Sequence, residues 1–148
     1  MGYQILQGVV AFIGCLSFSI ILYVPRKELV YCGFTGGFGW FIYCIINSIF
    51  NDAVISSFFS AIVVTASSRF LSHVRKQPST LFLIPGILPL VPGAGMYYTM
   101  DAVLKGSMIE SYIQAVNTLK VAGVIAIGII MILSLPYSVF SFIKVKEK

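Results

Sequence analysis

Long apolar runs constrain the fold of this sequence more than any other feature. Each run carries at most one charged residue, and short polar segments separate them: residues 2–24, 29–50, 53–71, 81–104 and 115–143. A helix needs about 20 apolar residues to cross the hydrocarbon core of a bilayer. We therefore predict an all-α integral membrane protein, with about five transmembrane helices in a single transmembrane domain over residues 1–148.

The composition excludes an ordinary soluble domain. Hydrophobic residues make up 58% of the 148 residues, and only 10% are charged. Soluble domains carry about 25% charged residues. The net charge of +5 is compatible with nucleic-acid binding, but the basic residues stand at the ends of the apolar runs. Such charges orient membrane helices, so we expect a lipid bilayer as the surroundings and no nucleic acid as a partner.

The basic residues also predict a topology. Eight of the ten basic residues fall on one side of a five-span arrangement: Arg26, Lys27, Arg69, Arg75, Lys76, Lys144, Lys146 and Lys148. Only Lys105 and Lys120 fall on the other side. Because cytoplasmic loops are enriched in Lys and Arg, we expect the N-terminus outside and the C-terminus in the cytoplasm. This arrangement requires the run at 81–104 to cross the membrane.

That fourth run is interrupted by residues that disfavour helix. Its central stretch, IPGILPLVPGAGMYY at residues 84–98, places three prolines and three glycines between Pro85 and Gly95. Proline lacks the backbone N–H, and glycine weakens a helix. Unpaired backbone cannot face lipid, so a discontinuous span must be shielded by protein or line a wet cavity. The alternative is a proline kink that binds no ligand.

A break at the middle of a span is where transporters place substrate sites. We expect a second half-helix to begin near Gly95, with free N–H groups that attract a carboxylate. The hypothesis is a site for a small anionic or zwitterionic solute. Its candidate substrate-binding residues are Pro89, Pro92, Gly93, Gly95, Tyr98 and Thr99.

Small residues at helical spacing predict where helices pack closely. Gly33 and Gly37 share one helix face, as do Ala122 and Ala126, and each pair would admit a neighbouring helix. Ser57, Ala61 and Thr65 form a third stripe, which is either a helix–helix seam, our preferred interpretation, or the wall of a pathway. Arg69 follows this stripe, and we expect it to extend to the headgroups.

The remaining polar residues do not form a catalytic or metal-binding pattern. Cys15, Cys32 and Cys44 match no zinc or redox spacing, so we interpret them as packing residues. His73 is expected in a basic loop over residues 72–80. We therefore predict no catalytic residue, no metal, no cofactor and no enzyme activity. Asp101 is either half of an i,i+4 ion pair with Lys105, which we favour, or a functional carboxylate within a span.

Two stretches resemble a known family. VPRKELVYCGFTGGFG at residues 24–39 and PSTLFLIPGILPLVPGAGMYYTM at residues 78–100 are similar to the small subunit of the threonine/serine exporter family. The specific part is the proline-rich core with Pro89 and Pro92-Gly93, followed by aromatic and hydroxyl residues at Tyr98 and Thr99. Asp101 has no counterpart in the family pattern.

The resemblance implies a bacterial inner-membrane exporter of small hydrophilic metabolites. Threonine and serine are the solutes that name the family, and a related branch is assigned to dicarboxylates such as succinate. Some members are one fused chain, whereas others are split. A chain of this kind then corresponds to the C-terminal half and works with a larger membrane subunit, with a higher oligomer as a further option. A structural or assembly subunit that does not itself transport is the alternative.

Overall fold

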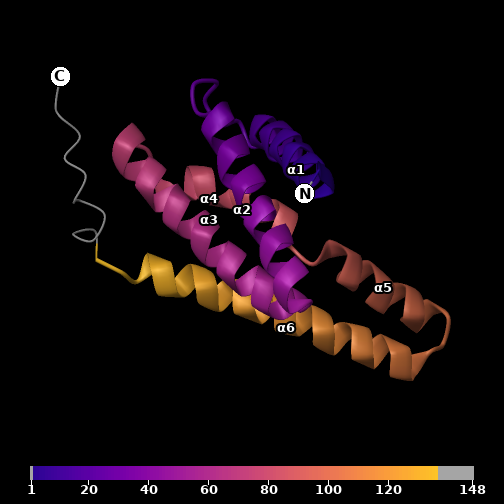
Figure 1. The fold of residues 1–148 in the computed structure, drawn as a ribbon. Coiled ribbons are helices and arrows are strands. Elements are labelled where there is room, and N and C mark those ends of the chain that lie inside the picture. Colours follow the sequence, from indigo (N-terminus) through magenta and orange to yellow (C-terminus); the bar gives the residue numbers. More distant parts are fainter. Residues whose placement is uncertain (1, 137–148) are drawn as a thin grey trace, which may run out of the picture.

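The computed structural model describes residues 2–136, and these residues form helices and turns without a strand. Figure 1 shows the arrangement. The elements in chain order are α1 (Gly2–Ile21), α2 (Leu29–Phe50), α3 (Ala53–Arg75), α4 (Ser79–Ile87), the short 3₁₀ helix η1 (Leu88–Leu90), α5 (Gly93–Leu104) and α6 (Met108–Leu133). Four helices are long and apolar enough to cross a membrane, and α4 with α5 makes a fifth if the bent pair is one span. The predicted all-α membrane architecture is confirmed.

Turn residues set the ends of the long helices. Asn51 ends α2 in the left-handed region at φ 52°, and Asp52 begins α3 by accepting hydrogen bonds from the N–H groups of Val54 and Ile55. A side-chain cap of this kind satisfies N–H groups that have no partner inside the helix. The short polar segment between the second and third apolar runs is thus a turn between two helices.

Some predicted boundaries were wrong. The first helix ends at Ile21 rather than at residue 24, since Tyr23 adopts φ 55° just ahead of Pro25. Helix α3 continues to Arg75, so His73 lies in its last turn and not in a loop. Helix α6 begins at Met108 instead of residue 115, directly after Gly106 at φ 76°. Residues 137–143 of the predicted last span lie outside the described residues.

Helix α2 is the centre of the packing, and its glycines bring three neighbours close. A Cβ on Gly33 would lie 2.8 Å from ring carbon Cε2 of Phe12 in α1, and one on Gly37 would lie 3.0 Å from Phe12 Cβ. The predicted close packing of this glycine pair is confirmed, with α1 of the same chain as the neighbour. Gly36 faces α1 and α4, and Gly39 faces Val64 of α3. Close approach of this kind is how membrane helices gain packing energy.

Helix α6 packs against α3 through the predicted stripe of small residues. Ser57, Ala61 and Thr65 are at most 2% exposed, and a Cβ on Gly128 of α6 would lie 3.2 Å from Ala61 Cβ. The seam interpretation of this stripe is confirmed. In contrast, Ala122 and Ala126 are exposed, because α6 turns Ile125 and Gly128 toward α3 instead. Within the described chain, the expected packing role of these two alanines is therefore not fulfilled.

The order of contacts shows the direction of each helix. Cys32, Thr35 and Gly36 of α2 meet Leu81, Phe82 and Gly86 of α4 in that order, so these two helices run the same way. Helices α3 and α6 also run the same way, since Ala61 meets Gly128 and Arg69 meets Ile132. If α3 and α6 both cross a bilayer, the segment between them must return across it once. Helices α4 and α5 form that segment.

Helix α5 leaves the bundle and pairs with the first half of α6. Its axis bends by 49° from the axis of residues 79–90. Figure 1 shows α5 and the start of α6 as a hairpin that extends beyond the other helices. A Cβ on Gly95 would collide with the Thr118 hydroxyl, and the Ser111 hydroxyl donates to the Thr99 carbonyl at 3.4 Å. The break between η1 and α5 therefore joins a buried half-helix to a protruding one.

Candidate functional site

The buried half-helix α4 contains a proline whose backbone cost is compensated by α2. Pro85 lies inside α4 and has no N–H to donate to the carbonyl of Leu81. The Cys32 thiol donates to that carbonyl at 3.4 Å, and the Thr35 hydroxyl donates to the carbonyl of Phe82 at 3.4 Å. Neighbouring polar side chains are the usual means by which a membrane helix tolerates proline. This half of the broken span is thus a well-satisfied core element.

The break itself leaves backbone groups without partners. Pro92, at φ −75° and ψ 57°, forms an inverse γ-turn in which the N–H of Gly93 donates to the carbonyl of Val91 at 2.7 Å. Within the described residues, no hydrogen bond outside the helices reaches the carbonyls of Pro89 or Leu90. The N–H groups at the start of α5, on Ala94 and Gly95, likewise have no such partner. Carbonyl acceptors and N–H donors are therefore both available within a few residues.

The six predicted site residues fall into two groups. Pro89, Pro92 and Gly93 lie at the break, and a Cβ on Gly93 would have no heavy atom within 4 Å. The other three lie on α5: Gly95, Tyr98 and Thr99. The space over Gly95 is filled by Thr118, and the Thr99 hydroxyl donates to the Gly95 carbonyl at 2.7 Å. Tyr98 is 55% exposed. Gly93 leaves open space at the break, whereas Gly95 contributes a free N–H but packs its Cα against α6 and leaves no room there for a solute.

A groove adjoins the break on the side of α1 and α2. Its volume is about 390 Å³, and it is lined by Leu6, Gln7, Val10, Ala11, Trp40 and Pro89. Trp40 stacks on Tyr43 with 4.9 Å between ring centroids, which holds the indole in place. The Cys44 thiol donates to Oε1 of Gln7 at 3.0 Å. The groove thus places one amide side chain beside the helix break.

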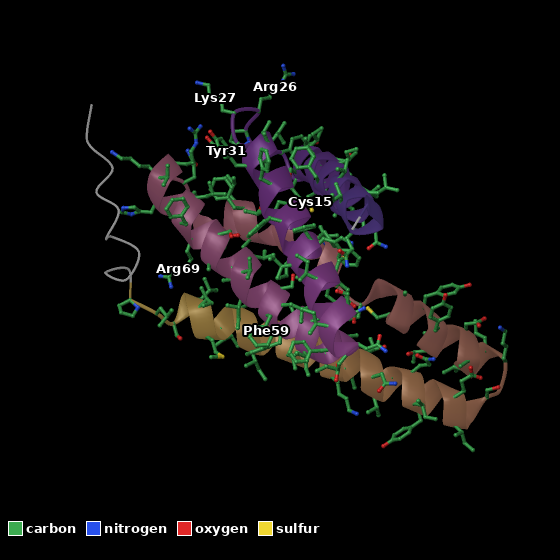
Figure 2. The ribbon with its side chains drawn as sticks, viewed as in Figure 1. Cys15, Arg26, Lys27, Tyr31, Phe59 and Arg69 are labelled. Atoms are coloured by element: carbon green, nitrogen blue, oxygen red, sulfur yellow. The ribbon has the colours of Figure 1, made fainter. Side chains whose placement is uncertain are left out.

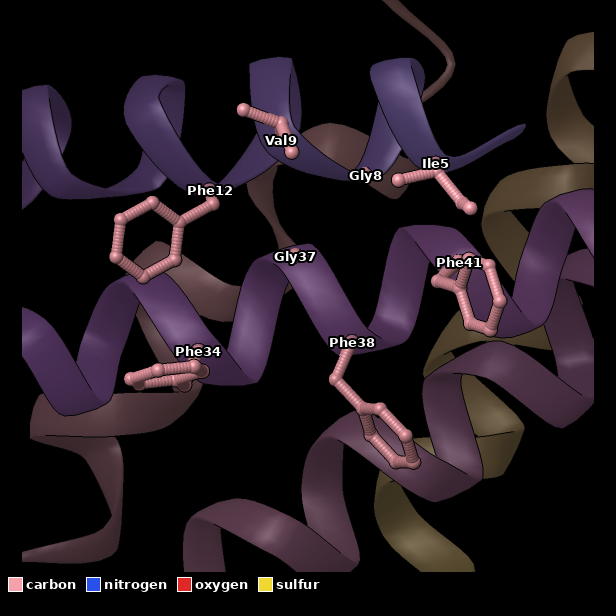
Figure 3. Close-up of a pocket in the computed structure, with 8 residues that line it drawn as sticks. All are labelled: Ile5, Gly8, Val9, Phe12, Phe34, Gly37, Phe38 and Phe41. Atoms are coloured by element: carbon pink, nitrogen blue, oxygen red, sulfur yellow. The ribbon is translucent and has the colours of Figure 1, made fainter. Parts of the chain in front are cut away.

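A larger groove lies on the other side of α1 and has a different character. Figure 3 shows the lining residues on two neighbouring helices, with Ile5, Gly8, Val9 and Phe12 on α1 and Phe34, Gly37, Phe38 and Phe41 on α2. Its volume is about 540 Å³, and none of these eight side chains has a hydrogen-bonding atom. Such a lining suits a lipid chain or an apolar side chain, and it offers nothing to orient a polar solute.

Arg69 does not extend to the headgroups, and that prediction was wrong. The residue is 4% exposed, and its Nη1 donates to the carbonyls of Leu133 at 3.1 Å and Leu135 at 2.8 Å, as well as to Ile132. Figure 2 shows its side chain at the C-terminal end of α6. The carbonyls at the end of a helix lack partners and carry partial negative charge. The guanidinium is therefore buried between α3 and the C-terminal end of α6.

Two ion pairs lie outside the site. Arg75 binds the buried carboxylate of Glu28 through Nε at 2.9 Å and Nη2 at 2.7 Å, and its guanidinium lies 4.7 Å from the centroid of the Tyr31 ring. Lys105 pairs with Asp101 at 2.7 Å, so the predicted i,i+4 pair is confirmed. The hydrogen bond to Asp101 raises the pKa of Lys105. Asp101 is thus engaged locally, on the hairpin, away from the break.

The cysteines and acidic residues form no ion-binding cluster in the described part of the chain. Cys15, Cys32 and Cys44 are buried between helices, as expected of packing residues.

Comparison with known proteins identifies the family. The sequence profile described as "Threonine/Serine exporter, ThrE" matches residues 7–135. The chain belongs to the threonine/serine exporter family. It is also 25% identical over 127 residues to an uncharacterized protein of Haemophilus influenzae, a match that covers 80% of this chain and 43% of that relative. The chain therefore spans less than half the length of this relative. No solved structure was found to match it.

Sequence reasoning on this exporter-family chain overlooked Gln7 and the partners of Arg69. Gln7 is an isolated amide in an otherwise apolar span, and that isolation was a usable signal, because polar groups in lipid are costly. Trp40 was not among the candidate site residues, although it lines the groove. The Arg69 contacts depend on where α6 ends, and no local pattern around Arg69 encodes that position.

Proposed function

We propose that this chain is a subunit of a bacterial inner-membrane exporter for small hydrophilic solutes, with threonine and serine as the substrates. The observation that carries the proposal is the break between η1 and α5. It offers free carbonyls at Pro89 and Leu90 and free N–H groups at Ala94 and Gly95. Broken helices in transporters use such groups to hold solutes at mid-membrane.

The two kinds of free group favour a zwitterion over a dicarboxylate. The C-terminal end of a helix attracts cations, and the N-terminal end attracts anions. An α-amino acid carries an ammonium and a carboxylate on one carbon, so a single break can hold both. A dicarboxylate such as succinate has no group for the carbonyl end. Amino acids are therefore the preferred solute class, and dicarboxylates are the second candidate.

A larger partner subunit is part of the proposal. Gly93 is exposed and open, and unpaired backbone at the break cannot face lipid. The α5–α6 hairpin also exposes large apolar side chains, including Met96, Tyr97, Tyr98, Ile109 and Tyr112. Membrane helices from a second component would cover both, with Ala122 and Ala126 as further small-residue contacts. The chain's share of its longer relative agrees with this arrangement.

We expect α1 to begin outside the cell and α6 to end toward the cytoplasm. This orientation rests on the basic residues at Arg26, Lys27, Arg75 and Lys76, which the fold gathers at one end of the bundle with the Glu28–Arg75 ion pair. Export then runs from the side of this basic end to the side of the Asn51 turn and the α5–α6 loop.

Substitution of Gly93 tests the proposal. Gly93→Leu fills the open space at the break, while Gly14→Leu on α1 is a matched control, since neither glycine has a heavy atom within 4 Å of its Cβ position. Cells lacking other threonine exporters are loaded with threonine, and its efflux is measured. The membrane abundance of the chain and the subunit that co-purifies with it are measured in parallel.

We expect Gly93→Leu to abolish efflux at normal abundance and assembly, and Gly14→Leu to retain it. Normal efflux by Gly93→Leu would contradict a solute site at the break. A different result would favour the alternative, a structural or assembly subunit whose partner transports alone. In that case efflux would require the co-purified subunit, and no substitution at the break would change the efflux rate.

A further inference from the structure

We propose that Gln7 is a specificity-determining residue that hydrogen-bonds the side-chain hydroxyl of the solute. This inference rests on the proposed function, because it assumes that an amino acid occupies the break. It extends that function to a residue on α1, more than eighty positions earlier in the sequence, and to the groove between α1, α2 and η1.

The amide of Gln7 is only half satisfied. Its Oε1 accepts from the Cys44 thiol at 3.0 Å. Its Nε2 donates to no other group among the described residues. An amide N–H without a hydrogen-bond partner in apolar surroundings is energetically unfavourable. An N–H donor without a partner that faces a groove in an apolar helix is available to a ligand.

The groove connects this donor to the break. Pro89 lines the groove and also contributes a free carbonyl at the break, so the two features share a residue. Trp40, held by its stacking on Tyr43, forms a flat wall. The volume of about 390 Å³ lies within the range of small-ligand sites. A solute whose backbone groups occupy the break would therefore place its side chain in the groove.

The lining determines which side chains fit. Apart from Gln7 and the indole N–H of Trp40, the lining side chains carry no hydrogen-bonding atom: Leu6, Val10, Ala11 and Pro89. A second carboxylate would be buried there without a cation, which is strongly unfavourable. A neutral hydroxyl needs only one or two hydrogen bonds, and Gln7 supplies a donor. The groove therefore fits the side chain of threonine or serine better than that of a dicarboxylate.

The test compares threonine with 2-aminobutyrate, which has the same carbon skeleton without the hydroxyl. Cells containing the chain and its co-purifying subunit are loaded with an equal mixture, and the two efflux rates are measured. Gln7→Met keeps an unbranched side chain of similar size and removes the donor, and Gln7→Leu is a second variant in case Gln7→Met loses abundance. Gln114→Met on α6 is the matched control, and Cys44→Ala removes only the thiol contact.

We expect the wild type to prefer threonine, and Gln7→Met to lower the threonine to 2-aminobutyrate ratio about fivefold to tenfold, the equivalent of one hydrogen bond. Gln114→Met should leave the ratio unchanged. An unchanged threonine to 2-aminobutyrate ratio in Gln7→Met and Gln7→Leu, with both variants present at normal abundance, would overturn the role of Gln7. An equal decrease of this ratio in Cys44→Ala would also overturn it, because the effect would then belong to helix packing. If the wild type exports neither compound, the proposed function itself fails.

Discussion

Substitution of Gly36 by alanine tests the packing that brings α1, α2 and α4 together. Gly36 is buried in α2, and the position of an added Cβ overlaps Sγ of Cys15 and lies 3.0 Å from its Cβ. On the other side it lies 3.5 Å from Cα of Gly86 in α4. The methyl group therefore has no room unless α1 moves, since the Cys15 Cβ is fixed by the backbone of that helix.

The size of the effect follows from two opposing contributions. Alanine is favoured over glycine in a helix by about 1 kcal/mol, and overpacking a tight core costs typically about 1–3 kcal/mol. Gly123 of α6 has no heavy atom within 4 Å of its Cβ position, so Gly123→Ala gains the first contribution without the second. We therefore expect Gly36→Ala to be less stable than Gly123→Ala by about 1–3 kcal/mol in free energy of unfolding.

The assay is reversible unfolding of the purified chain in mixed micelles, followed by helix content. The double variant Cys15→Ala/Gly36→Ala identifies the cause, since removal of Sγ clears the nearest atom. A double-mutant cycle should give a favourable coupling energy of about 0.5–3 kcal/mol between the two substitutions. The reasoning is refuted if Gly36→Ala is as stable as Gly123→Ala, or if the cycle shows no coupling.

Two further predictions concern the buried arginine and the topology. Arg69→Met should lower the free energy of unfolding by at least about 2 kcal/mol, because it leaves the carbonyls at the end of α6 without donors. Arg26→Met, in an exposed turn, is the control and should have little effect. Equal losses of stability in the two variants would contradict the role of Arg69. In a cysteine-free background, Lys105→Cys should react with an impermeant thiol reagent from outside intact cells, and Lys27→Cys should not. Labelling of both cysteines from the same side would contradict a chain that crosses the membrane five times.

The sequence predicted the helical architecture well because the hydrophobic signal is local. Each long apolar run became a helix, and the run around Pro85 to Gly95 was interrupted, since missing N–H groups and flexible glycines act on their own neighbourhood. The glycine pair at Gly33 and Gly37 was also interpreted correctly as a packing face. Spacing alone did not say which helix would occupy that face, and α1 of the same chain does so.

Helix ends in polar stretches were harder to predict. Residues 105–114 contain Lys105, Gly106 and Glu110 and were expected to be a loop, yet α6 begins at Met108. The turn uses only three residues because Gly106 adopts φ 76°. The first turns of α6 then pack against α5, which compensates for their polar composition, and this tertiary contact is absent from any local window of sequence.

Of the candidate site, the sequence predicted the break but not the surface beside it. Pro92 and Gly93 lie between the free carbonyls and the free N–H groups, whereas the Cα of Gly95 packs against Thr118 because α5 folds back onto α6. Gln7 comes to the break only because α1 runs antiparallel to α2 and brings its first turns beside Cys44 and Trp40. Pairings between distant helices of this kind require the fold.

The directions of the helices link the break to transport more firmly than composition does. Because α3 and α6 are parallel and pack along one seam, the chain between them has to cross the membrane if both of these helices span it, and α4 and α5 are each too short to do so alone. Residues Ser79–Leu90 extend about 18 Å as a helix, roughly half a bilayer core. The free backbone groups of Pro89, Leu90, Ala94 and Gly95 would then lie deep in the membrane, where lipid cannot satisfy them. A hydrophilic solute that crosses the membrane needs a space at that depth that is lined by protein and contains free hydrogen-bonding groups.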